Sequence, residues 1–245
     1  MCRILLALGN VQLPVLFTAI KQMALDRTTV HERNEKAGLG TWIHQDGWGL
    51  AIIKDNHFQL TKSTKPIFDD PKAEEIAKTS TNFALLHVRL VGKGRVCLEN
   101  THPFYYKTKS GEEIVFCHNG TIKEEIKFDQ KYQPQGETDT EQLFYAILTK
   151  YEETKNFSSA ITATFSSLLQ PWDSNIILST KTISYVFSQS IKYPRYLQMW
   201  IGKKKDSLIV CSEKIATMKD YSWEKLPKGK IVVIDHQTLT ILIPP

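Results

Sequence analysis

The residue of this sequence whose position most directly predicts chemistry is the cysteine at position 2. Removal of Met1 would leave Cys2 with a thiol and a free α-amine on the same residue. An α-amine has a pKa of roughly 7.7–8.0, so at neutral pH it can serve as the base for a neighbouring nucleophile. The alternative is that Cys2 is a small buried residue that opens the strand predicted over the apolar residues 2–8.

Two further motifs lie at the ends of predicted strands, where functional residues concentrate. Arg89 ends the apolar run 83–90, and its guanidinium can bind a carboxylate through two parallel hydrogen bonds. His118, Asn119 and Gly120 follow the strand predicted at 114–117. The Asn119 amide and the Gly120 backbone N–H could form an oxyanion hole. The structural alternatives are an ion pair for Arg89 and a plain Asn-Gly turn for residues 119–120.

Asp139 lies at the start of a helix predicted over 138–151, where Thr138 and Glu141 match a capping box. An acid in the first turn favours the helix dipole, and it could instead accept hydrogen bonds from a substrate ammonium.

Trp48 and Gly49 belong to the motif Asp-Gly-Trp-Gly at 46–49, which leads into a predicted strand. Two glycines around a tryptophan indicate either a tight turn or a place where the backbone approaches a substrate.

Composition and charge exclude several classes of protein. The chain has 245 residues, 42% hydrophobic and 23% charged, with a net charge of +5, which is ordinary for a globular protein. No run approaches the roughly 18 apolar residues of a membrane span, and the apolar run after Arg3 is too short for a secretory signal. The basic runs read as solvated turns, so no nucleic-acid partner is expected.

Four cysteines lie far apart, at positions 2, 97, 117 and 211, and form no close ligand pair. We therefore expect no metal site and no disulfide framework, with reduced thiols in a cytoplasmic protein. No cofactor is expected either.

The periodicity predicts strands at both ends of the chain and helices between them. Strands are expected at 2–8, 48–54, 58–62, 83–90 and 114–117. Six more are expected at 175–179, 183–188, 197–201, 208–212, 230–235 and 239–243. Helices are expected at 13–25, 71–78, 138–151 and 159–169. With no linker or repeat, the pattern favours one α+β domain over 1–245, with helices packed on sheets.

Taken together, the motifs resemble the class II glutamine amidotransferase domain, an N-terminal-nucleophile hydrolase of the stand-alone type. The order is Met-Cys-Arg at 1–3, Asp-Gly-Trp-Gly at 46–49, His-x-Arg at 87–89, Asn-x-His-Pro-Phe at 100–104, His-Asn-Gly at 118–120 and Thr-Asp-Thr-Glu at 138–141. The resemblance covers most of the chain. It implies a four-layer αββα sandwich of two antiparallel sheets.

The resemblance also implies a role for each residue. Cys2 is similar to the nucleophile, which would form a thioester with the glutamine side chain and release ammonia. Asn119 and Gly120 resemble the oxyanion hole. Arg89 resembles the binder of the substrate α-carboxylate and Asp139 that of its α-ammonium. Trp48, Gly49 and His118 match motifs that line the substrate site or support it.

One departure keeps the substrate open. Many family members follow the arginine with Trp-Ala-Thr-His-Gly, whereas this chain has Leu-Val-Gly-Lys-Gly at 90–94. We expect an amidohydrolase or amidotransferase that delivers ammonia to a separate acceptor subunit. The alternatives are a γ-glutamyl hydrolase acting on a peptide or thiol metabolite, and a non-catalytic binding or regulatory module with the same fold. A homo-oligomer is compatible with the sequence, which does not name the acceptor.

Overall fold

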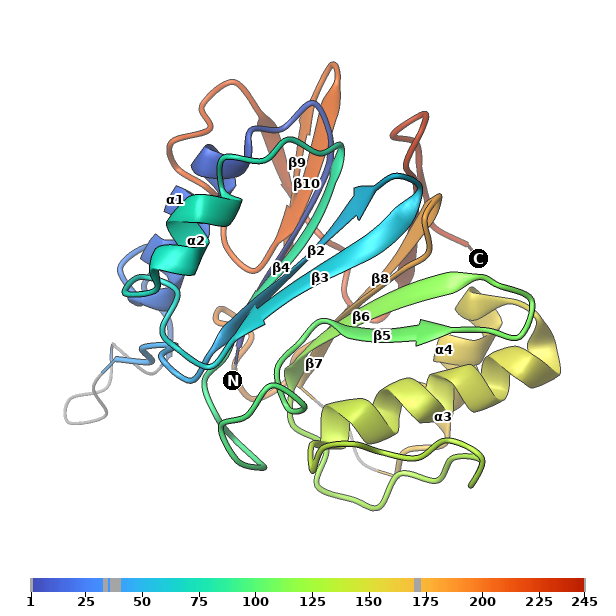
Figure 1. Ribbon diagram of the computed structural model, residues 1–245. Coiled ribbons are helices and arrows are strands. Elements are labelled where there is room, and N and C mark those ends of the chain that lie inside the picture. Colours follow the sequence, from blue (N-terminus) through green and yellow to red (C-terminus); the bar gives the residue numbers. More distant parts are fainter. Residues whose placement is uncertain (1, 33–34, 36–40, 170–172, 245) are drawn as a thin grey trace.

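The structure is a computed structural model that describes residues 2–32, 35, 41–169 and 173–244. Two antiparallel sheets pack face to face, and helices cover the outer face of each sheet (Figure 1). The predicted α+β class and the αββα layering are therefore confirmed. That residues 1–245 form a single domain stays a prediction.

The first sheet has seven strands in the order β11-β9-β10-β1-β4-β2-β3. Its N-terminal strand lies at the centre, with Leu5 paired to Cys211 on one side and to Leu86 on the other. The bounds are β1 (Arg3–Gly9), β2 (Trp48–Lys54), β3 (His57–Ser63), β4 (Phe83–Val88), β9 (Trp200–Lys204), β10 (Ser207–Cys211) and β11 (Ser222–Lys225).

The second sheet has six strands in the order β13-β12-β8-β7-β6-β5. Its strand β6 pairs with β7, so that Asn119 lies opposite Asn175 and Gly120 opposite Ser174. The bounds are β5 (Phe104–Lys107), β6 (Glu113–Gly120), β7 (Ser174–Ser179), β8 (Ile183–Gln189), β12 (Ile231–Asp235) and β13 (Ile241–Leu242).

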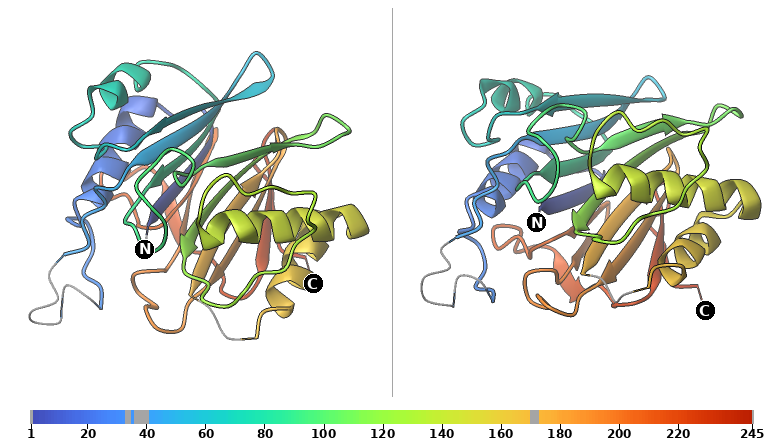
Figure 2. Two further views of the ribbon diagram at one scale, coloured as in Figure 1. Left: turned by 60° about the horizontal axis from the view of Figure 1, so that its bottom comes forward. Right: turned by 90° about the horizontal axis from the view of Figure 1, so that it is seen from below.

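The helices form the two outer layers (Figures 1 and 2). On the first sheet lie α1 (Leu13–Ala24) and α2 (Pro71–Ile76), and on the second lie α3 (Asp139–Thr154) and α4 (Phe157–Ser166). The Thr138 side chain caps α3 by accepting a hydrogen bond from the Glu141 backbone N–H, as the capping box predicts. None of the helices in the described part of the chain is long and apolar enough to cross a membrane.

Strand β1 is buried on both faces, which explains why its sequence is continuously apolar rather than alternating. Leu5 and Ala7 pack with α1, whereas Ile4, Leu6 and Leu8 pack between the two sheets. Because side chains alternate along a strand, Cys2 belongs to the face between the sheets and Arg3 to the face under α1. Cys2 and Arg3 therefore face two different polar regions, one on each side of the sheet.

The observed elements differ from the expected ones mainly at the sheet edges. Strands β5 and β11 are each four residues long and were not expected from the sequence, because so short a run carries little periodicity. Strand β9 begins at Trp200 rather than at residue 197, since Tyr196 and Leu197 turn into a buried aromatic cluster with Trp42.

Candidate active site

Five of the eight predicted site residues line one small cavity. Cys2 comes from the start of β1, Arg89 from the end of β4, His118 and Gly120 from the end of β6, and Asp139 from the start of α3. The pairing of Arg3 with Val88 places Cys2 beside Arg89. The cavity has a volume of about 30 Å³, which is close to the share of one water molecule in the liquid.

Asn119 binds the backbone of Cys2 directly. The Cys2 backbone nitrogen donates to Asn119 Oδ1 at 2.8 Å. Because only the carbonyl end of the amide can accept this bond, Nδ2 is left as a donor. Nδ2 is buried and has no hydrogen-bond partner among the described residues. The sixth predicted residue therefore presents an unused N–H donor next to Cys2.

Gly120 ends β6 where the backbone is too crowded for any side chain. A Cβ at this position would lie 2.4 Å from the Asp173 carbonyl oxygen and 2.5 Å from His118 Nε2. These contacts are shorter than real Cβ contacts, so the site requires glycine.

His118 is a buried support rather than a charged group. Its Nδ1 lies 2.9 Å from Thr140 Oγ1 and its Nε2 lies 2.8 Å from Ser174 Oγ. Burial lowers the pKa of His118 to about 4, so the ring is neutral at neutral pH. It ties the end of β6 to the first turn of α3.

Asp139 places a carboxylate at the cavity from the first turn of α3. Its Oδ2 accepts a hydrogen bond from the Ile122 backbone N–H at 2.6 Å. The bond fixes the carboxylate relative to the segment that follows β6. Asp139 therefore faces Cys2 and Arg89 across the same cavity.

Arg89 is enclosed by the loop that follows it. Its Nη1 donates to the Arg95 carbonyl oxygen at 2.9 Å, and its Nη2 donates to the carbonyl oxygen of Lys93 at 3.2 Å. The side chain is 4% exposed. Arg89 Nη2 also donates to the Gly94 carbonyl oxygen at 3.5 Å. The guanidinium thus contacts the backbone oxygens of all three residues 93–95.

The Asp-Gly-Trp-Gly motif acts through its first two residues. The Gly47 carbonyl oxygen accepts from the Arg89 backbone N–H at 2.9 Å, and the Asp46 side chain accepts from the Val91 N–H at 2.7 Å. These bonds fix the backbone on both sides of Arg89.

Trp48 and Gly49 lie outside the cavity lining, and their role in substrate binding stays a prediction. Trp48 is fully buried under α1, and its indole N–H donates to Asp70. A Cβ on Gly49 would lie 2.0 Å from the His102 carbonyl oxygen. Both residues support the site by packing.

His87 and His102 belong to the motifs at 87–89 and 100–104, but the sequence assigned neither histidine a role. Their rings lie 4.0 Å apart between centroids, and both are buried. His102 lines the cavity with Cys2. The signal available in the sequence was a histidine inside an otherwise apolar strand, at position 87.

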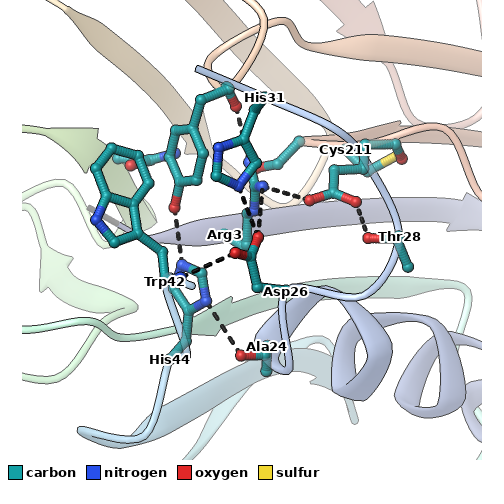
Figure 3. Close-up of polar contacts among 12 residues, drawn as sticks. Arg3, Ala24, Asp26, Thr28, His31, Trp42, His44 and Cys211 are labelled. Carbon is teal, nitrogen blue, oxygen red and sulfur yellow. Dashed lines mark hydrogen bonds and ion pairs between the residues drawn. The ribbon is translucent and has the colours of Figure 1, made fainter. Parts of the chain in front are cut away.

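A second polar group lies on the opposite face of β1, around Arg3 (Figure 3). The Arg3 guanidinium donates to the Tyr196 carbonyl oxygen at 2.7 Å, forms an ion pair with Glu213 and lies 4.0 Å from Asp26. Its Cζ stands 3.7 Å from the centre of the Tyr196 ring. Arg3, Asp26, Tyr196 and Glu213 are called the Arg3 cluster below.

The carboxylates of the Arg3 cluster are held by further donors. Asp26 contacts His31 Nε2 at 2.7 Å and the Trp42 backbone N–H at 2.9 Å. Burial opposes ionisation of Asp26, but these hydrogen bonds outweigh it and hold its pKa below the ordinary value. Glu213 accepts from Thr28, yet burial still raises its pKa.

Tyr196 connects the Arg3 cluster to Cys2. Its hydroxyl donates to the Cys2 carbonyl oxygen at 3.3 Å and lies 2.8 Å from His44 Nε2. Burial raises the pKa of Tyr196 and lowers that of His44, so both are neutral. The backbone of Cys2 is therefore held at its nitrogen by Asn119 and at its carbonyl by Tyr196.

Within the described residues, no group of three or more His, Cys, Asp or Glu side chains is arranged to hold a metal ion. The chemistry that the cavity can carry is that of a thiol, two amide-type donors, a guanidinium and a carboxylate.

The sequence matches the family described as glutamine amidotransferases, class II, over residues 12–191. This segment contains Arg89, Asn119, Gly120 and Asp139, whereas Cys2 precedes it.

Among curated proteins, YafJ of Escherichia coli, provisionally named a glutamine amidotransferase, is 26% identical over 83% of this chain and 81% of its own length. An uncharacterised protein of Methanocaldococcus jannaschii is 34% identical over 45% of this chain, and the match spans only 32% of that protein.

Among solved structures, the allosteric regulatory enzyme of purine biosynthesis is similar with a TM-score of 0.73 at 17% identity. The match covers 99% of this chain and 49% of that enzyme. A glutamine aminotransferase class-II domain protein from Silicibacter pomeroyi has a TM-score of 0.62 at 15% identity, with 100% of both chains covered. These likenesses show a shared fold.

Proposed function

Because this chain belongs to the class II glutamine amidotransferases, we propose that it hydrolyses the side-chain amide of glutamine through a thioester on Cys2. The ammonia released would serve a separate acceptor chain. The observation that carries the proposal is the hydrogen bond of 2.8 Å between the Cys2 nitrogen and Asn119 Oδ1, beside an unused Asn119 Nδ2. It supports the proposal because the Cys2 nitrogen, its thiol and an amide N–H donor lie close together, as a base, a nucleophile and an oxyanion donor would have to.

The first step requires Met1, which lies outside the described residues, to be removed. The Cys2 nitrogen then becomes an α-amine that accepts the thiol proton, directly or through a water. The sulfur attacks the amide carbon, and the carbonyl oxygen becomes an oxyanion. Asn119 Nδ2 and the Gly120 N–H donate to that oxygen, where fixed donors stabilise the developing charge.

The second half of the reaction releases the products. The amine returns its proton to the leaving nitrogen, the C–N bond breaks and ammonia departs. Water then attacks the thioester carbon, the C–S bond breaks, and glutamate leaves with Cys2 restored. Arg89 would bind the α-carboxylate of the substrate and Asp139 its α-ammonium, since both charged groups line the cavity with Cys2.

Substrate entry would require the loop after Arg89 to move. A cavity of about 30 Å³ is far smaller than the roughly 300–1,000 Å³ of a typical small-molecule pocket. The carbonyl oxygens of Lys93 and Arg95 also occupy the guanidinium that would bind the carboxylate.

A γ-glutamyl hydrolase is the second candidate, and the sequence of that loop favours it. The Thr and His that many family members carry after the arginine are replaced by Gly92 and Lys93, and Gly94 matches the glycine that follows them. Two glycines and a lysine leave the entrance without those side chains, so a substrate with a larger group on the γ-amide is compatible. A non-catalytic binding module is the third candidate and would not require removal of Met1.

The decisive experiment is a substrate panel. Purified protein is assayed for ammonia release from L-glutamine and for cleavage of γ-glutamyl peptides, with intact mass recorded in parallel. We expect Met1 to be absent, glutamine to be hydrolysed and a glutamine-analogue diazo-ketone to label Cys2. Cleavage of peptides without glutamine turnover would favour the second candidate.

The matched control compares two cysteines. Cys2→Ala should abolish turnover, whereas Cys97→Ala, which removes a partly exposed thiol outside the cavity lining, should not. Active protein that retains Met1 would contradict the mechanism, and inactive protein that retains Met1 and resists labelling would favour the binding module.

A further inference from the structure

The face of β1 that carries Cys2 also meets a pair of buried histidines, and three of their four ring nitrogens lack a hydrogen-bond partner among the described residues. His87 is 0% exposed and His102 is 4% exposed. Both ring nitrogens of His87 and the Nδ1 of His102 have no hydrogen-bond partner in the part of the chain that the structure describes. Buried polar atoms are nearly always paired, so three unpaired atoms in two touching rings require an explanation.

The protonation state of the two histidines determines which molecule could form hydrogen bonds with their ring nitrogens. Burial lowers the pKa of both histidines, and the nearby Arg89 guanidinium lowers the pKa of His87 further. Each ring is thus neutral and carries one N–H donor and one lone-pair acceptor. A buried donor or acceptor without a partner is destabilising, so a guest that pairs with these atoms is favoured. The complementary guest is a small neutral molecule that both donates and accepts hydrogen bonds.

The location of the pair connects it to the nucleophile. His87 pairs with Ile4 across β1 and β4, and Ile4 packs between the sheets. Because alternate residues share a face, Cys2, Ile4 and His87 direct their side chains to the same side of the sheet. The His102 ring packs against the His87 ring at an interplanar angle of 47°, and His102 lines the cavity with Cys2. Gly49, which pairs with His87, leaves room for the His102 backbone.

We propose that His87 and His102 bind one water molecule beside Cys2, and that this water hydrolyses the thioester. The proposal rests on the proposed function. The water oxygen forms the new C–O bond, the C–S bond breaks, one water proton ends on the Cys2 sulfur and the other leaves with the product carboxyl group. The histidines hold and orient the water and end the step with the protons they began with.

The test separates formation of the thioester from its hydrolysis. In His87→Leu, which keeps the volume but removes both nitrogens, we expect ammonia to appear as a burst equal to the enzyme concentration. Steady-state turnover should then fall at least tenfold. Hydroxylamine, which replaces water as the attacking molecule, should restore turnover. Labelling of Cys2 by the diazo-ketone should stay within about twofold of the wild-type rate.

The control variant is His57→Leu, since His57 is a mostly exposed histidine on the edge strand β3. It should show neither a burst nor a loss of turnover. If His87→Leu loses labelling and turnover together, or loses neither, the water-binding role is wrong.

A crystal structure of the unsubstituted protein provides the second measurement and does not depend on the variant folding. We expect a peak of electron density within hydrogen-bond distance of a His87 nitrogen and His102 Nδ1. An empty site would overturn the proposal, as would a peak whose occupancy depends on ammonium in the crystals, because the guest would then be ammonia. Absence of glutamine hydrolysis and of Cys2 labelling in the unsubstituted protein would instead refute the proposed function.

Discussion

Cys2 and Arg3 are neighbours in sequence, yet they face two buried polar regions of opposite character. The Arg3 cluster is closed: its guanidinium, its carboxylates and the Tyr196 carbonyl contact one another, and only Nε of Arg3 lacks an ion-pair or hydrogen-bond partner among the described residues. On the Cys2 side, Asn119 Nδ2 and three histidine nitrogens have no hydrogen-bond partner within the described ranges.

The difference indicates what each region is for. Buried groups that satisfy one another leave nothing for a ligand to bind and contribute to holding the strand in place. Buried groups that are unpaired beside a thiol gain partners only when a substrate or water arrives. Because side chains alternate along β1, the Arg3 cluster that holds the strand and the thiol of the proposed reaction belong to adjacent residues on opposite faces.

The largest loss of stability should come from removing the cation of the Arg3 cluster. Arg3→Met would leave Asp26 and Glu213 buried without their cation, and removing one partner of a buried ion pair typically costs about 3–5 kcal/mol of unfolding free energy. Urea unfolding at pH 7 measures this loss. Lys203→Met is the control, because its ion pair with Glu224 is about half exposed and should contribute less than about 1 kcal/mol. Equal losses would contradict the comparison.

The second largest effect should be a loss of kcat on replacing Asn119, on the Cys2 side of β1. Asn119→Asp keeps the shape and the oxygen facing the Cys2 nitrogen but replaces the unused donor by an acceptor. Loss of one oxyanion donor lowers kcat by about 10²–10³, and we expect that loss in ammonia release with little change in melting temperature.

Asn175→Asp is its counterpart on β7, directly opposite Asn119. Both ends of the Asn175 amide are used, by Leu197 and Ser188. This variant should lose stability while kcat of the folded enzyme changes only a few-fold. The reverse pattern would refute the division between the two regions.

A smaller effect should follow the titration of His118. Its folded pKa of about 4 lies below the ordinary 6.5, so between these values the unfolded chain binds a proton that the folded chain does not. Stability is therefore complete above pH 6.5 and falls as the pH is lowered toward 4. His118→Gln should make that fall shallower by up to about 1.4 kcal/mol per pH unit. Unfolding free energies measured from pH 7 to 4 check this, and parallel slopes would contradict it.

The smallest effect should come from the link between the regions. Tyr196→Phe removes the hydroxyl that donates to the Cys2 carbonyl. A neutral hydrogen bond contributes about 0.5–1.5 kcal/mol, so we expect kcat to fall about two- to tenfold at unchanged KM. A raised KM with normal kcat would show that Tyr196 does not act through Cys2.

The sequence predicted which residues belong to the candidate site better than it predicted the strands and helices that surround them. Arg89, Asn119, Gly120 and Asp139 were identifiable because motifs at strand and helix ends are local and their spacing is visible. The short edge strands β5 and β11 were missed because their hydrogen bonds come from distant partners. The burial of Trp48 under α1 could not be predicted, because a Gly-Trp-Gly motif does not reveal which face of a strand is covered by a helix.

Arg3 and the histidine pair were harder to interpret from sequence for a related reason. A charged residue near a chain end normally suggests solvent, and only the fold places α1, Asp26 and Glu213 over it. The absence of partners around His87 is a property of three-dimensional neighbours. No spacing in the chain encodes it.

The central place of β1 in its sheet bears on when Met1 would be removed during synthesis and folding. Its partner strands are β4 and β10, and β10 ends only at Cys211. At synthesis rates of about 5–20 residues per second, roughly 10–40 seconds pass before both neighbours exist. During that interval the strand cannot be enclosed, so the N-terminus stays accessible to the peptidase that would remove Met1. Once β10 pairs, Cys2 is buried and its backbone nitrogen is bound by Asn119, so we expect removal of Met1 to precede that pairing.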